Sequence, residues 1–90
     1  MRTIWKFALT VADSQVIEMP REAKILSAQM QGESLSLWAE VIPERARTKR
    51  IIEVYGTGHT IEDDADLIFI GTVQMLGGQL IFHVFERLSR

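Results

Sequence analysis

Gly56, Thr57, Gly58 and His59 form the segment whose composition best suits ligand binding. One glycine on each side of a small hydroxyl residue allows backbone N–H groups to approach a ligand closely. A phosphate loop of the known types needs a longer glycine pattern that leads into a helix, and this segment has neither. Two interpretations therefore stay open, a ligand-binding loop or a tight turn at the end of a strand.

His59 is the side chain of this segment that can exchange a proton near neutral pH. A catalytic histidine works with a nucleophile and an orienting group, and no serine, cysteine or second histidine lies near it in the sequence. A reaction that uses His59 with an acidic partner such as Asp64 is the weakest hypothesis. We predict that the protein is not an enzyme.

Four cations, Arg45, Arg47, Lys49 and Arg50, occur within six residues. Arginine binds phosphate and carboxylate groups through two parallel hydrogen bonds. The arginines either contact a small anionic ligand, together with the amides of residues 56–58, or belong to a solvated loop. The only aromatic side chains close to them in sequence are Trp38 and Tyr55, so nucleic-acid binding is not expected.

Glu62, Asp63, Asp64 and Asp66 place four carboxylates within five residues. A calcium loop needs a glycine at its sharp turn and a closing glutamate, and both are missing. The segment is typical of a solvated acidic loop. We predict no metal and no cofactor, and we expect about one strand length, roughly 20 Å, between this loop and the arginines.

The composition limits the class of protein. A chain of 90 residues with 47% hydrophobic side chains suits one globular domain, over residues 1–90. Without cysteine it has no disulfide, thiolate–metal or thiol chemistry. Its longest apolar stretch is far shorter than the roughly 20 residues of a membrane span, and Lys6 interrupts the N-terminal run that a signal peptide would need. We expect a cytoplasmic protein.

Apolar and polar residues alternate with period two in short segments separated by turn residues, which predicts an all-β fold. In the first segment Trp5, Phe7, Leu9 and Val11 share one face. We expect a small antiparallel sandwich or partly open barrel of six to seven strands, mostly a meander. The expected strands are residues 2–11, 15–19, 24–31, 35–42, 49–55, 67–75 and 79–86.

The last strands are apolar on both faces. If Leu80, Phe82 and Val84 fill the core, then the alternate residues need cover from a second sheet or a second copy of the chain. Trp38 likewise lies opposite the core-facing side of its strand. We predict a homo-oligomer, with a dimer favoured, whose interface contains Trp38, Tyr55, Leu67, Phe69, Ile81, His83 and Phe85.

Several short motifs are spread along the chain: IWKF at 4–7, AKILS at 23–27 with Gln29, LWA at 37–39, YGTGH at 55–59, IGT at 70–72, GG at 77–78 and FHVFE at 82–86. Together they resemble a family of small proteins encoded by phages and prophages. The resemblance covers nearly the whole chain and departs from the family at Arg21 and Glu22, where a glycine-containing turn is expected, and in the 87–90 tail.

The resemblance implies a phage or prophage origin and an accessory role inside the bacterial host, with no activity to transfer to particular residues. Our first hypothesis is a non-enzymatic binding protein that contacts a host protein. The alternative is an oligomeric sponge for a nucleotide signal, acting against host defence, with the anion held by Gly56, Thr57, Gly58, His59 and the three arginines.

Overall fold

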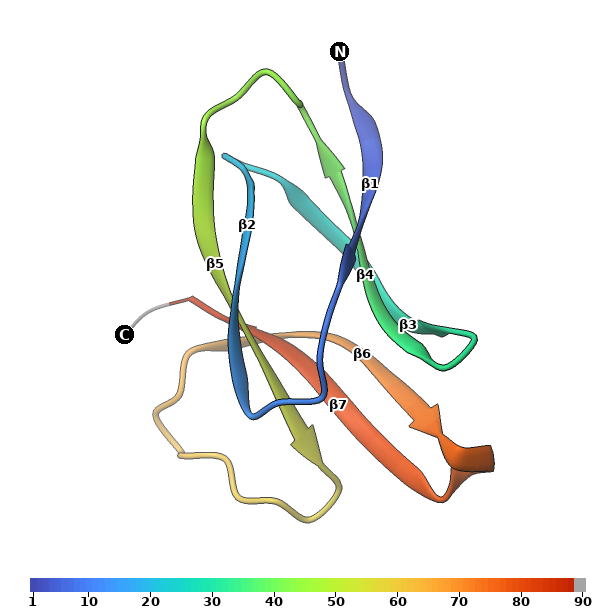
Figure 1. The fold of residues 1–90 in the computed structure, drawn as a ribbon. Helices are drawn as coiled ribbons and strands as arrows, with labels where there is room; N and C mark the ends of the chain where they lie inside the picture. Colours follow the sequence, from blue (N-terminus) through green and yellow to red (C-terminus); the bar gives the residue numbers. More distant parts are fainter. Residues whose placement is uncertain (89–90) are drawn as a thin grey trace.

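The computed structural model describes residues 1–88 and is built from β-strands (Figure 1). The prediction of an all-β domain is confirmed, because the described residues contain no α-helix and one short 3-10 turn, η1 (Leu76–Gly78). The strands are β1 (Thr3–Ala8), β2 (Ser14–Pro20), β3 (Lys24–Gln31), β4 (Ser34–Val41), β5 (Arg47–Gly56), β6 (Leu67–Met75) and β7 (Leu80–Arg87).

The strands form two antiparallel sheets, with the orders β1-β4-β3 and β2-β5-β7-β6. They do not close into a barrel and are consistent with a small sandwich. The mostly meander connectivity is wrong, since only β3–β4 and β6–β7 are hairpins of consecutive strands. Turn residues mark where a strand ends but not which strand it pairs with. β2 is an edge strand, as Pro20 predicts, because proline has no N–H to donate.

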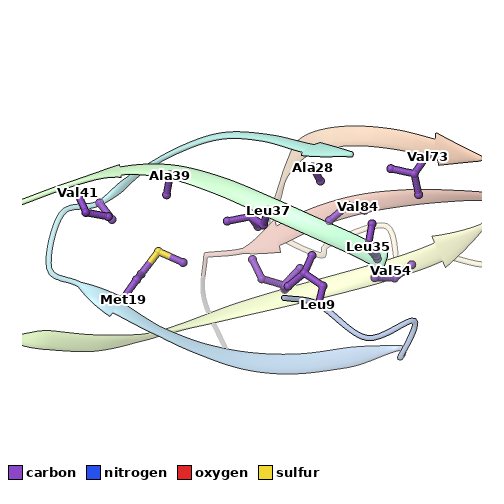
Figure 2. Close-up of a cluster of buried hydrophobic side chains, with 12 residues drawn as sticks. Leu9, Met19, Ala28, Leu35, Leu37, Ala39, Val41, Val54, Val73 and Val84 are labelled. Atoms are coloured by element: carbon purple, nitrogen blue, oxygen red, sulfur yellow. The ribbon is translucent and has the colours of Figure 1, made fainter. Parts of the chain in front are cut away.

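The core lies between the two sheets and follows the predicted alternation in β4 and β5. Leu37 of β4 and Ile52 of β5 are fully buried, as are Met19 and Val84. Figure 2 shows side chains from both layers pointing into this space. Burying apolar area in this way contributes roughly 25 cal/mol per Å², which is the main favourable term for a domain without disulfides.

Three apolar residues that strict alternation along their strands places on a core-facing side are exposed. A β-bulge shifts the register of β3 between Ile25 and Ser27, so Leu26 is turned outward and is 44% exposed. Val11 is 46% exposed because β1 ends before it. Leu80 is the first residue of β7 and is 42% exposed.

The sheets meet along one side, where β3 and β6 lie next to each other. A Cβ atom at Gly71 of β6 would be 2.9 Å from the carbonyl oxygen of Ala28, which is closer than real Cβ atoms approach. β6 also has a bulge between Phe69 and Gly71. The two bulged edge strands therefore shield each other, and the close approach requires glycine at position 71.

Residues 57–66 connect β5 to β6. Both strands are antiparallel to β7 and lie on either side of it, so they are parallel to each other and the connection is a crossover. This crossover contains the predicted acidic loop, and its residues form no strand. It is tied to β7 at its end, where the Leu88 N–H donates to the Asp66 carbonyl at 2.9 Å.

Candidate functional site

The glycine-histidine segment is a tight turn at the end of β5. The His59 N–H donates to the Gly56 carbonyl at 3.0 Å, and the Gly56 N–H donates back to His59 Nδ1 at 3.2 Å. Gly58, at φ 90°, has the left-handed conformation that favours glycine. The turn interpretation is therefore confirmed, and it leaves ligand contact open as a prediction.

These bonds fix the position and the tautomer of His59. A Cβ atom at Gly56 would lie 2.9 Å from His59 Cε1, so the imidazole lies directly over the glycine. Because Nδ1 accepts the Gly56 N–H, the proton of the neutral ring is on Nε2. His59 therefore presents an oriented N–H donor on an exposed turn.

The crossover begins with a second histidine contact. Thr57 Oγ1 lies 2.8 Å from His83 Nε2, and Thr72 Oγ1 lies 3.0 Å from His83 Nδ1. A neutral imidazole donates through one nitrogen and accepts through the other, so both ring nitrogens are satisfied by threonine hydroxyls. His83 thus joins the crossover, β6 and β7.

His59 stands between two surface hollows. One, of about 320 Å³, is mostly apolar. The other, of about 340 Å³, is polar. The apolar hollow is lined by Gly56, Thr57, His59, Gln79, Leu80, Ile81 and Phe82. The polar hollow is lined by Asp13, Ser14, Glu53, Val54, Tyr55, His59, Thr60 and Arg87.

A buried ionic cluster forms the floor of the polar hollow. The Arg87 guanidinium donates through Nε and Nη2 to both oxygens of Glu53, the second bond at 3.0 Å, and the Tyr55 hydroxyl donates to Glu53 at 2.6 Å. This hydrogen bond, then burial and the charge of Glu53, raise the pKa of Tyr55 above its ordinary 10.0. The hydrogen bond from Arg87 to Glu53 also raises the pKa of Arg87.

The predicted arginines do not gather at this site. Arg50 is paired through two bonds with Glu86 and donates to the Ala23 carbonyl at 2.9 Å. Arg47 begins β5 whereas Gly56 ends it, which separates them by about 30 Å at ~3.4 Å per residue. Arg45 lies still further along the chain and pairs with Glu22. An anion site that uses both the glycines and these arginines therefore needs a second subunit.

The predicted interface residues fall on two faces. Ile52, Val54 and Val84 point into the core, so the alternate residues of β5 and β7 form the outer face of the four-stranded sheet. Phe85 contacts Tyr55 at 5.8 Å and Phe69 at 5.5 Å between ring centroids. We call this surface the aromatic face; it contains Tyr55, Leu67, Phe69, Ile81, His83 and Phe85.

Trp38 lies on the other side of the molecule. It alternates with the buried Leu37 and Ala39 of β4, so it belongs to the outer face of the three-stranded sheet. Its cross-strand neighbours are Lys6 and Ser27. The structure therefore separates Trp38 from the other six predicted interface residues.

The comparison with known families matches residues 1–90 to a domain of unknown function, DUF7352. The chain belongs to this family. No curated protein and no solved structure matches the DUF7352 chain. Among residues 1–88 of this DUF7352 domain, no helix is long and apolar enough to cross a membrane, and no three His, Cys, Asp or Glu side chains lie together as metal ligands would.

Sequence reasoning missed the two arginine–glutamate pairs of the DUF7352 domain. The sequence predicts either an anion contact or a place in a solvated loop for Arg50, and it predicts no role for Glu53, Glu86 and Arg87. The available signal was the presence of charged side chains within otherwise apolar strands. A charged side chain that is buried is usually held in an ion pair. Recognising the pairs requires the register between β5 and β7, which the sequence does not supply.

Proposed function

We propose that this DUF7352 protein is a non-enzymatic binding protein of phage or prophage origin, working in the bacterial cytoplasm as a homodimer that contacts a host protein. The aromatic face is the observation that supports the proposal. Phe69, on the edge strand β6, is 56% exposed, and Ile81 and Val16 are exposed on the same side of the sheet. Exposed apolar surface of this kind is typical of protein contacts.

The charges and polar groups of the aromatic face favour a second copy as its occupant. Glu53 and Arg87 neutralise each other there, so the face selects no oppositely charged partner. The Tyr55 hydroxyl and both nitrogens of His83 already have hydrogen-bond partners within the chain. An apolar face with satisfied polar groups resembles homodimer interfaces, which are more apolar than other contacts.

Light scattering at micromolar concentration tests the dimer. We expect twice the chain mass of 10.3 kDa for the wild type and a monomer for Phe69→Glu. Ile4→Glu is the matched control, because Ile4 is 58% exposed on the outer face of the other sheet. A monomeric wild type, or equal effects of the two variants, would contradict the proposed interface.

Affinity capture from bacterial lysate tests the binding role itself. Wild type and Ile4→Glu are expected to retain a stoichiometric bacterial protein. Repeated capture at high protein concentration that returns no such partner would count against the function even if the dimer is correct.

A further inference from the structure

We infer that the His59 end of the molecule binds a protein segment in which an apolar side chain is followed by a lysine or arginine, the two side chains occupying the hollows on either side of His59. The inference rests on the proposed function, for which it supplies the chemistry of the partner. It differs from the sequence-based alternative of an anionic ligand, because the charges around His59 are negative.

The charge distribution follows from the strand directions. β5 ends where β2 and β7 begin, and β1 ends where β4 begins, so the segments 9–13, 32–33, 57–59 and 76–79 gather at one end of the sandwich (lower half of Figure 1). These segments contain Asp13 and Glu33 and neither lysine nor arginine. The crossover that starts there continues with Glu62, Asp63 and Asp64, and it ends with Asp66 at the far end of β7, beside Leu88.

The opposite end has mixed charge. The turn after β2 contains Arg21 and Glu22, and the connection from β4 to β5 contains Glu44 and Arg45, with Arg45 paired to Glu22. The loops at the His59 end therefore carry negative charge without a matching cation, whereas the charges in the loops at the opposite end balance each other. A cationic partner segment is attracted to the His59 end, and an anionic one is repelled.

The two hollows select different side chains. Leu80, Ile81 and Phe82 line the first, which suits an aliphatic or aromatic side chain. Asp13 lines the second, where Glu53 is already matched by Arg87, so Asp13 supplies the unbalanced negative charge. A lysine or arginine placed there gains a carboxylate partner.

His59 fixes the register of the bound segment. It lines both hollows, and its Nε2–H is directed by the bond between Nδ1 and Gly56. A backbone carbonyl between the two partner side chains is the acceptor that this donor fits. Adjacent side chains of an extended segment point to opposite sides, as two hollows separated by one imidazole require.

Amide chemical-shift titration of the wild type tests the inference with three probes: acetyl-Gly-Leu-Lys-Gly-amide, its Leu-Glu counterpart and adenosine monophosphate. We expect the lysine peptide to shift the amides of residues 13–14 and 56–60 and to bind at least fivefold more tightly than the other two probes. Its affinity is expected to fall with added salt. Equal or tighter binding of the glutamate peptide or the nucleotide would overturn the inference.

Variants separate the site from the rest of the surface. Asp13→Asn and His59→Ala are each expected to lower the affinity for the lysine peptide at least threefold. Glu33→Gln is the matched control, because Glu33 is an exposed carboxylate at the same end that lines neither hollow. If Asp13→Asn behaves like Glu33→Gln, the inference fails.

The same samples distinguish this inference from the proposed dimer. Tyr55 and Ile81 line the hollows and also belong to the aromatic face. Phe69→Glu is therefore expected to become monomeric and to bind the lysine peptide at least as tightly as the wild type, whereas Asp13→Asn is expected to stay dimeric. If the wild type dimerises but does not bind the peptide, the result agrees with the proposed interface and contradicts only the His59 site. Loss of peptide binding in a folded Phe69→Glu would show that the hollows belong to the dimer interface, which also overturns a separate site.

Discussion

Glu53 of β5 and Arg87 of β7 are diagonal neighbours that form a two-bond ion pair on the outer face of the four-stranded sheet. Arg50 and Glu86 repeat the arrangement on the inner face with the charges exchanged between the strands. The central strand pair is therefore joined by one ionic contact on each face. Both contacts are largely withdrawn from water, which makes them sensitive to the loss of either partner.

Replacing Arg87 by methionine is expected to lower the free energy of unfolding by about 3 kcal/mol, because a carboxylate that is only 6% exposed loses its guanidinium. Urea denaturation followed by tryptophan fluorescence measures the change. The control is Arg2→Met, whose pair with Glu40 involves a side chain that is 71% exposed and is expected to contribute less than about 1 kcal/mol. Similar small losses in both variants would show that the Glu53–Arg87 pair is not the stabilising contact inferred here.

The raised pKa of Tyr55 predicts a loss of stability in alkaline solution. The folded protein keeps the phenol proton at a pH where the unfolded chain has lost it, so the unfolded state binds fewer protons and stability falls as the pH rises. The contribution is complete below the unfolded pKa of about 10 and disappears as the pH passes the folded value. Unfolding free energies from pH 8 to 11 should therefore converge for wild type and Tyr55→Phe. A difference that stays constant over this range would contradict the Glu53–Tyr55 bond.

The turn between β2 and β3 has a residue in an unfavourable conformation. Glu22 has a φ of 64°, at the place where the resemblance to the phage proteins leads us to expect glycine. Glu22→Gly is expected to stabilise the protein by about 0.5 to 1 kcal/mol, because glycine adopts this conformation without the Cβ penalty. Glu22→Ala is the control, since it removes the exposed pair with Arg45 but keeps the strain, and it should change the stability by less than about 0.5 kcal/mol. A lower stability of Glu22→Gly would show that the backbone at Glu22 is not strained.

The alternation of the sequence predicted the fold class, and Pro20 predicted that β2 is an edge strand. These features depend on residues close together in the chain. The sequence did not predict the exchange of strands between sheets, because the pairing of β1 with β4 and of β2 with β5 depends on how two apolar faces cover each other. The bulge that exposes Leu26 was missed for a related reason, since one extra residue reverses the alternation without a change in composition.

In the candidate site, too, the features set by neighbouring residues were predictable and those set by distant residues were not. The glycine pattern of residues 56–59 predicted a turn or binding loop, and local hydrogen bonds form that turn. Within one chain the arginines do not join this turn, because Arg47 and Gly56 are at opposite ends of one strand, so an anion site that uses both needs a pocket shared between subunits. Six of the predicted interface residues share the aromatic face because they alternate along neighbouring strands, whereas Trp38 is on a strand of the other sheet. Proximity in sequence predicted contact within a turn and did not predict contact between loops.

Alanine at Gly71 is expected to cost much more stability than alanine at Gly56, although the added Cβ meets an atom at 2.9 Å in both cases. At Gly71 the atom is the Ala28 carbonyl oxygen, which is held in β3, so the two sheets must move apart. We expect Gly71→Ala to lower the unfolding free energy by about 2 kcal/mol. At Gly56 the atom belongs to the exposed His59 ring, which is free to rotate away, so the loss should stay below about 1 kcal/mol.

The chemical shifts of the His59 ring provide the second readout. Gly56→Ala is expected to displace the ring and disrupt its bond to the residue 56 N–H, while Gly71→Ala leaves that bond unchanged. Thermal or urea unfolding together with the imidazole ¹H and ¹⁵N shifts separates the two effects. An equally large loss of stability in both variants would mean that the imidazole supports the fold rather than resting on its surface, and an unchanged ring in Gly56→Ala would show that the glycine is not what positions His59.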